Sequence, residues 1–505
     1  MCISDNHNVF ITTKELRHKV LNTKKIALCV LASLWQFLRN ISINFPSKDP
    51  CKSVQIRDSQ KLPEAPQNEV PPKKSVKIPK KNRNFAFFRK HRTMPSISQR
   101  GRTAYTSPIR KLSPYADQAK KEGKQVFHLN IGQPDIVTPQ EAISRLQQTP
   151  IDILAYSPSK GNQSYLNKLP QYYSRHGIEV SPEDIVITTG ASEAILFALM
   201  ACLDTTEEII IPEPFYANYI GYAEMANVKV KAVTSYIENG FALPDAAAFQ
   251  ACITPQTRAI LLCNPVNPTG CLYTEAQLME LAQLVKEHDL YLIVDEVYRE
   301  FCYDEHPFFS VLNIEGMEDN IIVIDSISKR YSACGARIGS IITRNRDILH
   351  IVNRYAEIRL SPPTFGQLLG EYLIDIPDTY LEKVKAEYIK RRDLLYHRLS
   401  AMEEVVCYRP NGAFYCFAQL PIDDCDLFCQ WLLESFSHQN KTVMLAPGRG
   451  FYFTPGLGRQ EVRIAYVLKA EDLMEAMDCL EIALQVYPGR EKVESVRIEE
   501  MSAEI

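Results

Sequence analysis

Glycine is absent from the first 100 residues of this 505-residue chain, and all 20 glycines lie at Gly101 or later. A segment without glycine lacks the residue that forms tight turns most easily. The same segment is basic: residues 1–93 contain 19 Lys and Arg against 6 Asp and Glu, whereas the remainder contains 38 against 54. The chain therefore joins a basic extension to an acidic body, and the acidic charge argues against nucleic-acid binding by that body.

The 14 cysteines include no Cys-x-x-Cys pair and no Cys/His spacing that suits zinc, so we expect no metal site. Free cysteines at this density indicate a reducing compartment, and we expect the cytoplasm. The extension has one strongly apolar run, residues 24–38. The core of that run is about a dozen residues, short of the roughly 20 that span a bilayer, so it suits a targeting segment better than a membrane anchor.

Residues 62–92 are rich in proline and in basic side chains, which predicts a disordered linker. Met94 begins a more ordinary sequence and is an alternative start of the natural chain. We therefore expect residues 1–93 to be a disordered extension that is either a targeting segment or an artefact of gene prediction.

Beyond residue 126, near-continuous apolar runs alternate with helical patterns; examples of the runs are DIVITTG, RAILLCNP, LYLIVDEVY and NIIVIDSIS. This alternation predicts an α/β fold with a mostly parallel sheet that is covered by helices on both faces. The second half, with a helix-rich stretch and shorter strands, predicts a smaller α+β domain. We assign the chain to an N-terminal arm with part of the small domain (94–145), a large domain (146–375), a small C-terminal domain (376–490) and a charged tail (491–505).

Polar residues follow several of these strands, at the edge where parallel sheets bind ligands. The segment TTGAS places Gly190, Ala191 and Ser192 at the start of a helix, whose free N–H groups attract a phosphate. Ser192 could equally be a simple N-cap. The segment NPVNPTG forces a rigid turn around Asn267, which is either structural or functional.

Two further segments carry charge at strand ends. VDEVY ends a buried strand at Asp295, where a carboxylate is costly unless it meets a cation, and Tyr298 can direct its hydroxyl to the same pocket. In SISKRYSACGARIG, Ser326 and Arg337 flank Lys329. Serine and arginine suit a phosphate, and a lysine that is partly desolvated beside cationic groups becomes a usable nucleophile. A helix-capping aspartate and a solvated loop lysine are the plainer alternatives.

Taken together, these segments supply an amine nucleophile, an anion cradle, an unpaired carboxylate and two hydrogen-bonding side chains. A phosphate-bearing aldehyde with a basic ring nitrogen would use all of them. Pyridoxal phosphate is such a compound, so we predict it as the cofactor.

With these segments in this order, the chain resembles the fold-type I pyridoxal-phosphate aminotransferases of the aspartate aminotransferase superfamily. The motifs N-P-x-N-P-T-G, D-E-x-Y and S-x-S-K-x(7)-R-x-G occur in the family's order, and the resemblance covers residues 107–490. It implies a seven-stranded large-domain sheet and a transaminase. It also implies that Lys329 forms the Schiff base and moves the proton, and that Asp295 pairs with the ring nitrogen.

The resemblance implies further roles. Tyr298 and Asn267 would bond the 3-oxygen of the ring, and the phosphate would be held by Ser326, Arg337 and the backbone of residues 190–192. Tyr216 would stack on the ring, and Arg463 would clamp the substrate α-carboxylate. Gly132 would approach the substrate through its backbone. Tyr156 resembles a tyrosine that reaches the phosphate of a partner subunit, which implies a homodimer with shared active sites.

Substrate choice stays open at this point. We favour an aspartate- or glutamate-type donor, but that needs a second cation, for which Arg354, Arg359 and Arg449 are candidates. Without it, the enzyme would prefer neutral or aromatic amino acids. A carbon–sulfur β-lyase or a cyclopropane-forming synthase would share most of the site residues. More remote alternatives are a membrane-tethered enzyme and a ligand-sensing regulator, and the regulator would need a DNA-binding head that residues 1–93 do not resemble.

Overall fold

The computed structural model describes residues 96–304 and 307–492, and every structural statement below concerns these residues. The predictions for the extension 1–93 lie outside the described residues, as do those for the charged tail from residue 493. Among the described helices, none combines the length and the apolar character needed to cross a bilayer.

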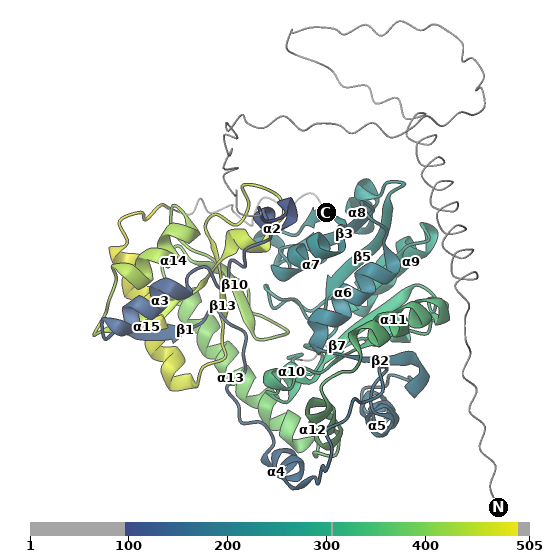
Figure 1. Ribbon diagram of the computed structural model, residues 1–505. Helices are drawn as coiled ribbons and strands as arrows, with labels where there is room; N and C mark the ends of the chain where they lie inside the picture. Colours follow the sequence, from purple (N-terminus) through teal and green to yellow (C-terminus); the bar gives the residue numbers. More distant parts are fainter. Residues whose placement is uncertain (1–95, 305–306, 493–505) are drawn as a thin grey trace, which may run out of the picture. The chain divides into compact units, whose positions relative to one another are not determined.

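The larger sheet has seven strands (Figure 1). In spatial order they are β2 (Ile185–Thr188), β8 (Gly339–Ile342), β7 (Ile321–Ser326), β6 (Tyr291–Asp295), β5 (Thr257–Cys263), β3 (Glu208–Glu213) and β4 (Lys229–Thr234). The five strands from β7 to β4 are parallel, and β8 runs antiparallel to both of its neighbours. The predicted α/β fold with a mostly parallel seven-stranded sheet is confirmed.

Helices cover both faces of this sheet because its strands are apolar on both sides. In β6, Ile293 faces a core that includes α6 (Gly190–Cys202), α7 (Asn218–Ala226) and α11 (Arg346–Arg359). Its neighbours Leu292 and Val294 face a second core. The second core includes α5 (Gln163–Ser174), α8 (Ala246–Cys252), α9 (Glu275–Glu287) and α12 (Thr364–Ile374), and α4 (Gln140–Gln148) packs on α12.

The smaller part of the fold contains two further sheets. A four-stranded antiparallel sheet has the order β12 (Ala446–Pro447), β13 (Glu461–Ala465), β10 (Tyr415–Gln419) and β9 (Val406–Cys407). A parallel pair joins β1 (Gln125–His128) to β11 (Lys441–Met444), so a strand from the beginning of the described chain lies beside one from its end. The remaining α-helices are α2 (Gln99–Thr103), α3 (Ser113–Lys121), α10 (Ile327–Arg330), α13 (Thr379–Ala401), α14 (Cys425–Glu434) and α15 (Ala470–Val486).

Strand direction brings the predicted polar segments to one edge of the large sheet. β5, β6 and β7 are parallel, so their carboxyl ends at Cys263, Asp295 and Ser326 lie at the same edge. Gly339 of β8 pairs with both Ser326 and Thr188, which brings the carboxyl end of β2 to that edge too. All four predicted segments therefore reach the same region, as expected for a parallel sheet.

Candidate active site

A cavity of about 520 Å³ lies at this edge. Most of the side chains predicted for the site line it: Gly132, Ala191, Ser192, Tyr216, Asn267, Asp295, Tyr298, Ser326, Lys329, Arg337 and Arg463. Gly190 directly precedes the lining residues Ala191 and Ser192. Of the predicted residues, Tyr156 alone neither lines the cavity nor adjoins a lining residue, and it is 81% exposed.

Lys329 reaches the cavity through the short helix α10. The hydroxyl of Ser326 caps this helix by accepting a hydrogen bond from the Ser328 amide at 3.1 Å. The Lys329 Nζ donates to the carbonyl oxygen of Gly132 at 2.7 Å and lies 6.0 Å from the ring centre of Tyr298. Among the described residues, no carboxylate forms a salt bridge with Lys329, so its amine is available to a ligand in the cavity.

Asp295 ends β6 and is buried, with 5% of its surface exposed. One carboxylate oxygen accepts the Tyr219 hydroxyl at 2.9 Å, and the other accepts the Val297 amide at 3.3 Å. No cation in the described chain forms a salt bridge with it. Burial raises the pKa of Asp295 to about 7. A buried carboxylate without a cationic partner, facing a cavity, fits a ligand that brings a protonated ring nitrogen.

The start of α6 forms an anion cradle with Arg337. Gly190 has φ +73°, and a Cβ there would overlap the Arg337 guanidinium. A Cβ at Gly339 would lie 2.6 Å from the Ala191 amide nitrogen, so these two glycines let the three segments approach closely. A helix N-terminus beside a guanidinium is suited to a phosphate. The hydroxyls of Ser326 and Ser328, 2.7 Å apart, line the same cavity.

Arg463 lies in the middle of β13 with 1% of its surface exposed. Its Nη1 donates to the side-chain oxygen of Asn267 at 2.9 Å, and its Nη2 donates to the Asn130 carbonyl at 2.5 Å. The guanidinium lies over the Tyr415 ring at 4.6 Å. Burial lowers its pKa from the ordinary value. No described carboxylate pairs with Arg463, so a carboxylate ligand in the cavity would supply the missing counter-charge.

Tyrosines complete the walls of the cavity. The Tyr298 and Tyr415 hydroxyls are 2.9 Å apart. A Cβ at Gly132 would overlap the Tyr415 hydroxyl, so the backbone passes this ring only because position 132 is a glycine. The Tyr216 hydroxyl accepts the side-chain amide of Asn218 at 2.8 Å, and its ring lies edge-on to Tyr219 at 5.4 Å.

Sequence reasoning missed several residues at the site. Tyr219 and Tyr222 follow Tyr216 at intervals of three, so helical spacing could have placed them on one face of α7. Tyr415 and the segment containing Arg110 also line the cavity. Nothing in their local sequence marks them, because they come from parts of the chain that only the tertiary fold brings to this edge.

None of the three arginines predicted as a second cation lines the cavity. Arg359 pairs with Glu193 at 2.8 Å, and Arg449 pairs with Asp424 at 2.7 Å. Arg354 is exposed on α11. The two paired arginines already have carboxylate partners, which explains why neither is directed to the site.

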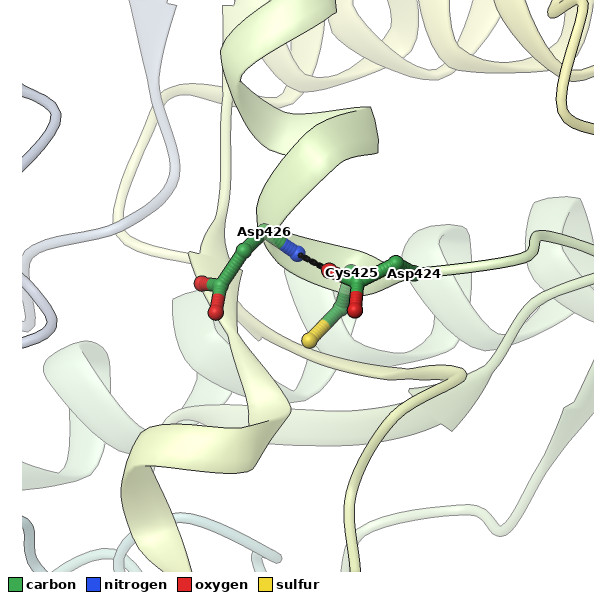
Figure 2. A group of neighbouring side chains, drawn as sticks. All are labelled: Asp424, Cys425 and Asp426. Carbon is green, nitrogen blue, oxygen red and sulfur yellow. Dashed lines mark hydrogen bonds between the residues drawn. The ribbon is translucent and has the colours of Figure 1, made fainter. Parts of the chain in front are cut away.

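Asp424, Cys425 and Asp426 form a group that could in principle hold a metal (Figure 2). Asp424 is the N-cap of α14 and accepts the Asp426 amide at 2.9 Å, as the dashed line in Figure 2 marks. Its second oxygen binds Arg449, and Asp426 binds Lys111 at 2.5 Å. Helix capping and ion pairing account for these carboxylates without a metal ion.

The chain is similar in sequence and in structure to known proteins. The family described as aminotransferase class I and II matches residues 124–480. The aromatic-amino-acid aminotransferase 2 of Thermococcus litoralis is 32% identical over 77% of this chain and 98% of its own length. The aspartate aminotransferase of Pyrococcus horikoshii is 28% identical over 77% of this chain and 97% of its own. The crystal structure of aspartate aminotransferase from Thermotoga maritima superposes with a TM-score of 0.69 at 28% identity, over 77% of this chain and all of that chain.

Proposed function

The chain belongs to the class I and II aminotransferases and is a transaminase, and we propose that the cavity described above is its active site. Enzymes of this class use pyridoxal phosphate. One observation carries the assignment to this cavity: it is lined by an amine, a buried carboxylate and a buried guanidinium, none of which has a salt-bridge partner among the described residues. The reaction exchanges an amino group between an L-amino acid and a 2-oxo acid.

The unpaired groups fit the cofactor. Arg337 and the start of α6 would hold its phosphate, and Asp295 would accept a hydrogen bond from its ring nitrogen. Tyr298 and Asn267 would bond the 3-oxygen, and Tyr216 would pack on the ring face. When bound, pyridoxal phosphate supplies the electron sink that accepts the charge left on the substrate Cα as its proton departs.

The chain's own residues do the binding and the proton transfer. Arg463 binds the substrate α-carboxylate in bidentate fashion, which fixes the orientation of Cα. Lys329 would hold the cofactor through its Nζ, and the same Nζ would move the proton to and from the substrate Cα. The Gly132 carbonyl accepts a hydrogen bond from this amine, which holds the amine in the cavity.

Replacement of Lys329 by alanine tests this assignment. We expect Lys329→Ala to abolish turnover with every amino donor, because the same amine binds the cofactor and moves the proton. The matched control is Lys231→Ala on β4, whose amine pairs with Glu208 at 3.3 Å, away from the cavity. Substantial turnover by Lys329→Ala, with L-glutamate, L-aspartate or L-phenylalanine as donor, would contradict the assignment.

We also propose that the enzyme works as a homodimer. Ile153, Leu154 and Tyr156 are 83%, 58% and 81% exposed, which is unusual for three apolar side chains so close together. Large exposed apolar patches commonly mark protein interfaces. A second copy of the chain would cover them and would allow Tyr156 to reach the phosphate of the partner's cofactor.

A further inference from the structure

The segment before α3 is fastened over the cavity at several points. The Tyr105 amide donates to Glu224 at 3.0 Å, and its hydroxyl donates to the Gly450 carbonyl at 3.3 Å. Pro108 is buried and packs so closely on Gly450 that a Cβ at position 450 would overlap its ring. Lys111 pairs with Asp426 at 2.5 Å. These contacts fix the position of residues 105–111 beside the cavity.

Asn130 connects this segment to Arg463, the residue proposed to bind the substrate α-carboxylate. Its side-chain amide donates to the Ile109 carbonyl at 3.1 Å, and its own carbonyl accepts Arg463 Nη2 at 2.5 Å. Asn130 is fully buried, and its bond to Arg463 is shielded from water. The backbone of Ile109 is thus tied through one residue to the guanidinium of Arg463, and Arg110 follows it directly.

The charges of the cavity lining are unbalanced. Arg110, Lys329, Arg337 and Arg463 line the cavity, and Asp295 is the only carboxylate in that lining. The proposed function assigns Lys329, Arg337 and Arg463 to the cofactor and the α-carboxylate. Arg110 stays without an assignment. Its side chain forms no hydrogen bond or ion pair with any described residue.

On the basis of the proposed function, we infer that Arg110 binds the distal carboxylate of a dicarboxylic substrate. The site therefore takes amino dicarboxylates of the aspartate and glutamate class and the corresponding 2-oxo diacids. Two guanidiniums on the same cavity, Arg463 and Arg110, match the two carboxylates of such a molecule. Because Arg110 is exposed at the rim, a neutral or aromatic donor leaves it hydrated at little cost, so it favours diacids without excluding other donors.

The test compares donors in the cofactor-loaded enzyme. We expect Arg110→Gln to lower kcat/KM for L-aspartate and L-glutamate by about 10- to 100-fold, as for the loss of a hydrogen-bonded charge at a partly hydrated site. For L-alanine and L-phenylalanine, kcat/KM should change by less than about threefold, because surface substitutions without a partner have small effects. Arg110→Lys should recover part of the loss. The control Arg102→Gln removes an exposed arginine of α2 from the same arm and should change none of these values.

A binding measurement separates recognition from a structural effect. Succinate has two carboxylates and no amine, so it occupies both proposed anion positions without reacting. Its dissociation constant should rise in Arg110→Gln by a factor similar to the fall in kcat/KM, whereas that of propionate should stay unchanged.

Three results would overturn the inference: equal losses for all donors, no loss with diacids, or a wild-type enzyme that transaminates other donors but no diacid. Failure of wild-type enzyme with every donor would instead refute the proposed function, and this inference would fall with it.

Discussion

Replacing Asp295 by asparagine should have opposite effects on the cofactor-free and the cofactor-loaded protein. Without cofactor, Asp295 is a buried carboxylate without a cation, and its pKa is raised to about 7 from the ordinary 3.8. Between these two values the folded protein retains a proton that the unfolded chain releases, so stability falls as pH rises through this window and levels off above it. Asparagine has no charge to desolvate and can bond both Tyr219 and Val297.

The size of this loss of stability follows from the pH range between the two pKa values, 3.8 and about 7. Each pH unit inside it is equivalent to about 1.4 kcal/mol, so the full penalty above pH 7 is on the order of 4 kcal/mol. Between about pH 5.5 and about pH 8.5 the penalty grows by about 2 kcal/mol, because it stops growing near pH 7. The stability advantage of Asp295→Asn over wild type should grow by that amount.

Denaturant unfolding of the cofactor-free protein at these two pH values checks the prediction. The matched control is Asp325→Asn on the neighbouring strand β7. Asp325 is buried too, but Arg299 and Arg330 bind it at 3.0 and 2.9 Å and keep its pKa well below the ordinary range. Asp325→Asn should destabilise the protein at both pH values. An Asp295→Asn effect that does not change with pH would show that this carboxylate is not buried without a cation.

With cofactor bound, the sign reverses. In the proposed function the ring nitrogen pairs with Asp295, so asparagine would remove one side of a buried charge pair. Such a loss is worth about 2–5 kcal/mol, or about 30- to 4,000-fold in the rate constant for amino transfer. Single-turnover conversion of the bound cofactor by L-glutamate measures it. An unchanged rate in Asp295→Asn would remove Asp295 from the reaction.

Two further substitutions test the remaining assignments. Arg463→Ala should weaken carboxylate recognition by about 2–5 kcal/mol, measured as kcat/KM for all donors alike, and an unchanged value would exclude Arg463 from the site. Tyr156→Phe should lower the affinity for pyridoxal phosphate by about 10- to 100-fold, as for one hydrogen bond to a charged group, while light scattering still shows a dimer. Persistence of that effect in a monomeric preparation would be inconsistent with a tyrosine supplied by the partner, and a wild-type monomer with full activity would refute the dimer proposal.

The sequence predicted the centre of the site because each of its segments lies within a few residues of a strand end. Asp295 ends β6, Ser326 ends β7, and Asn267 follows β5 by four residues. In a parallel sheet these ends share one edge, so local patterns were enough to bring together side chains that are distant in sequence. The family resemblance added Arg463 and Gly132, whose surroundings carry no such local signal.

Residues that reach the site through tertiary packing alone were not predicted. Arg110 arrives because Pro108 packs on Gly450 and Asn130 holds Ile109, and neither contact leaves a trace in sequence spacing. The candidates chosen for the second cation were instead near known motifs. The structure gives Arg359 a partner in Glu193 and Arg449 a partner in Asp424, and neither arginine lines the cavity.

The proposed function requires that pyridoxal phosphate is attached covalently to Lys329. Reduction of the cofactor-loaded enzyme with borohydride fixes the cofactor on the lysine that holds it, and peptide mass spectrometry then identifies that lysine. We expect one labelled peptide, containing Lys329, and no label when L-glutamate has first converted the cofactor to its amine form. A label on another lysine, or the same label after L-glutamate treatment, would contradict it.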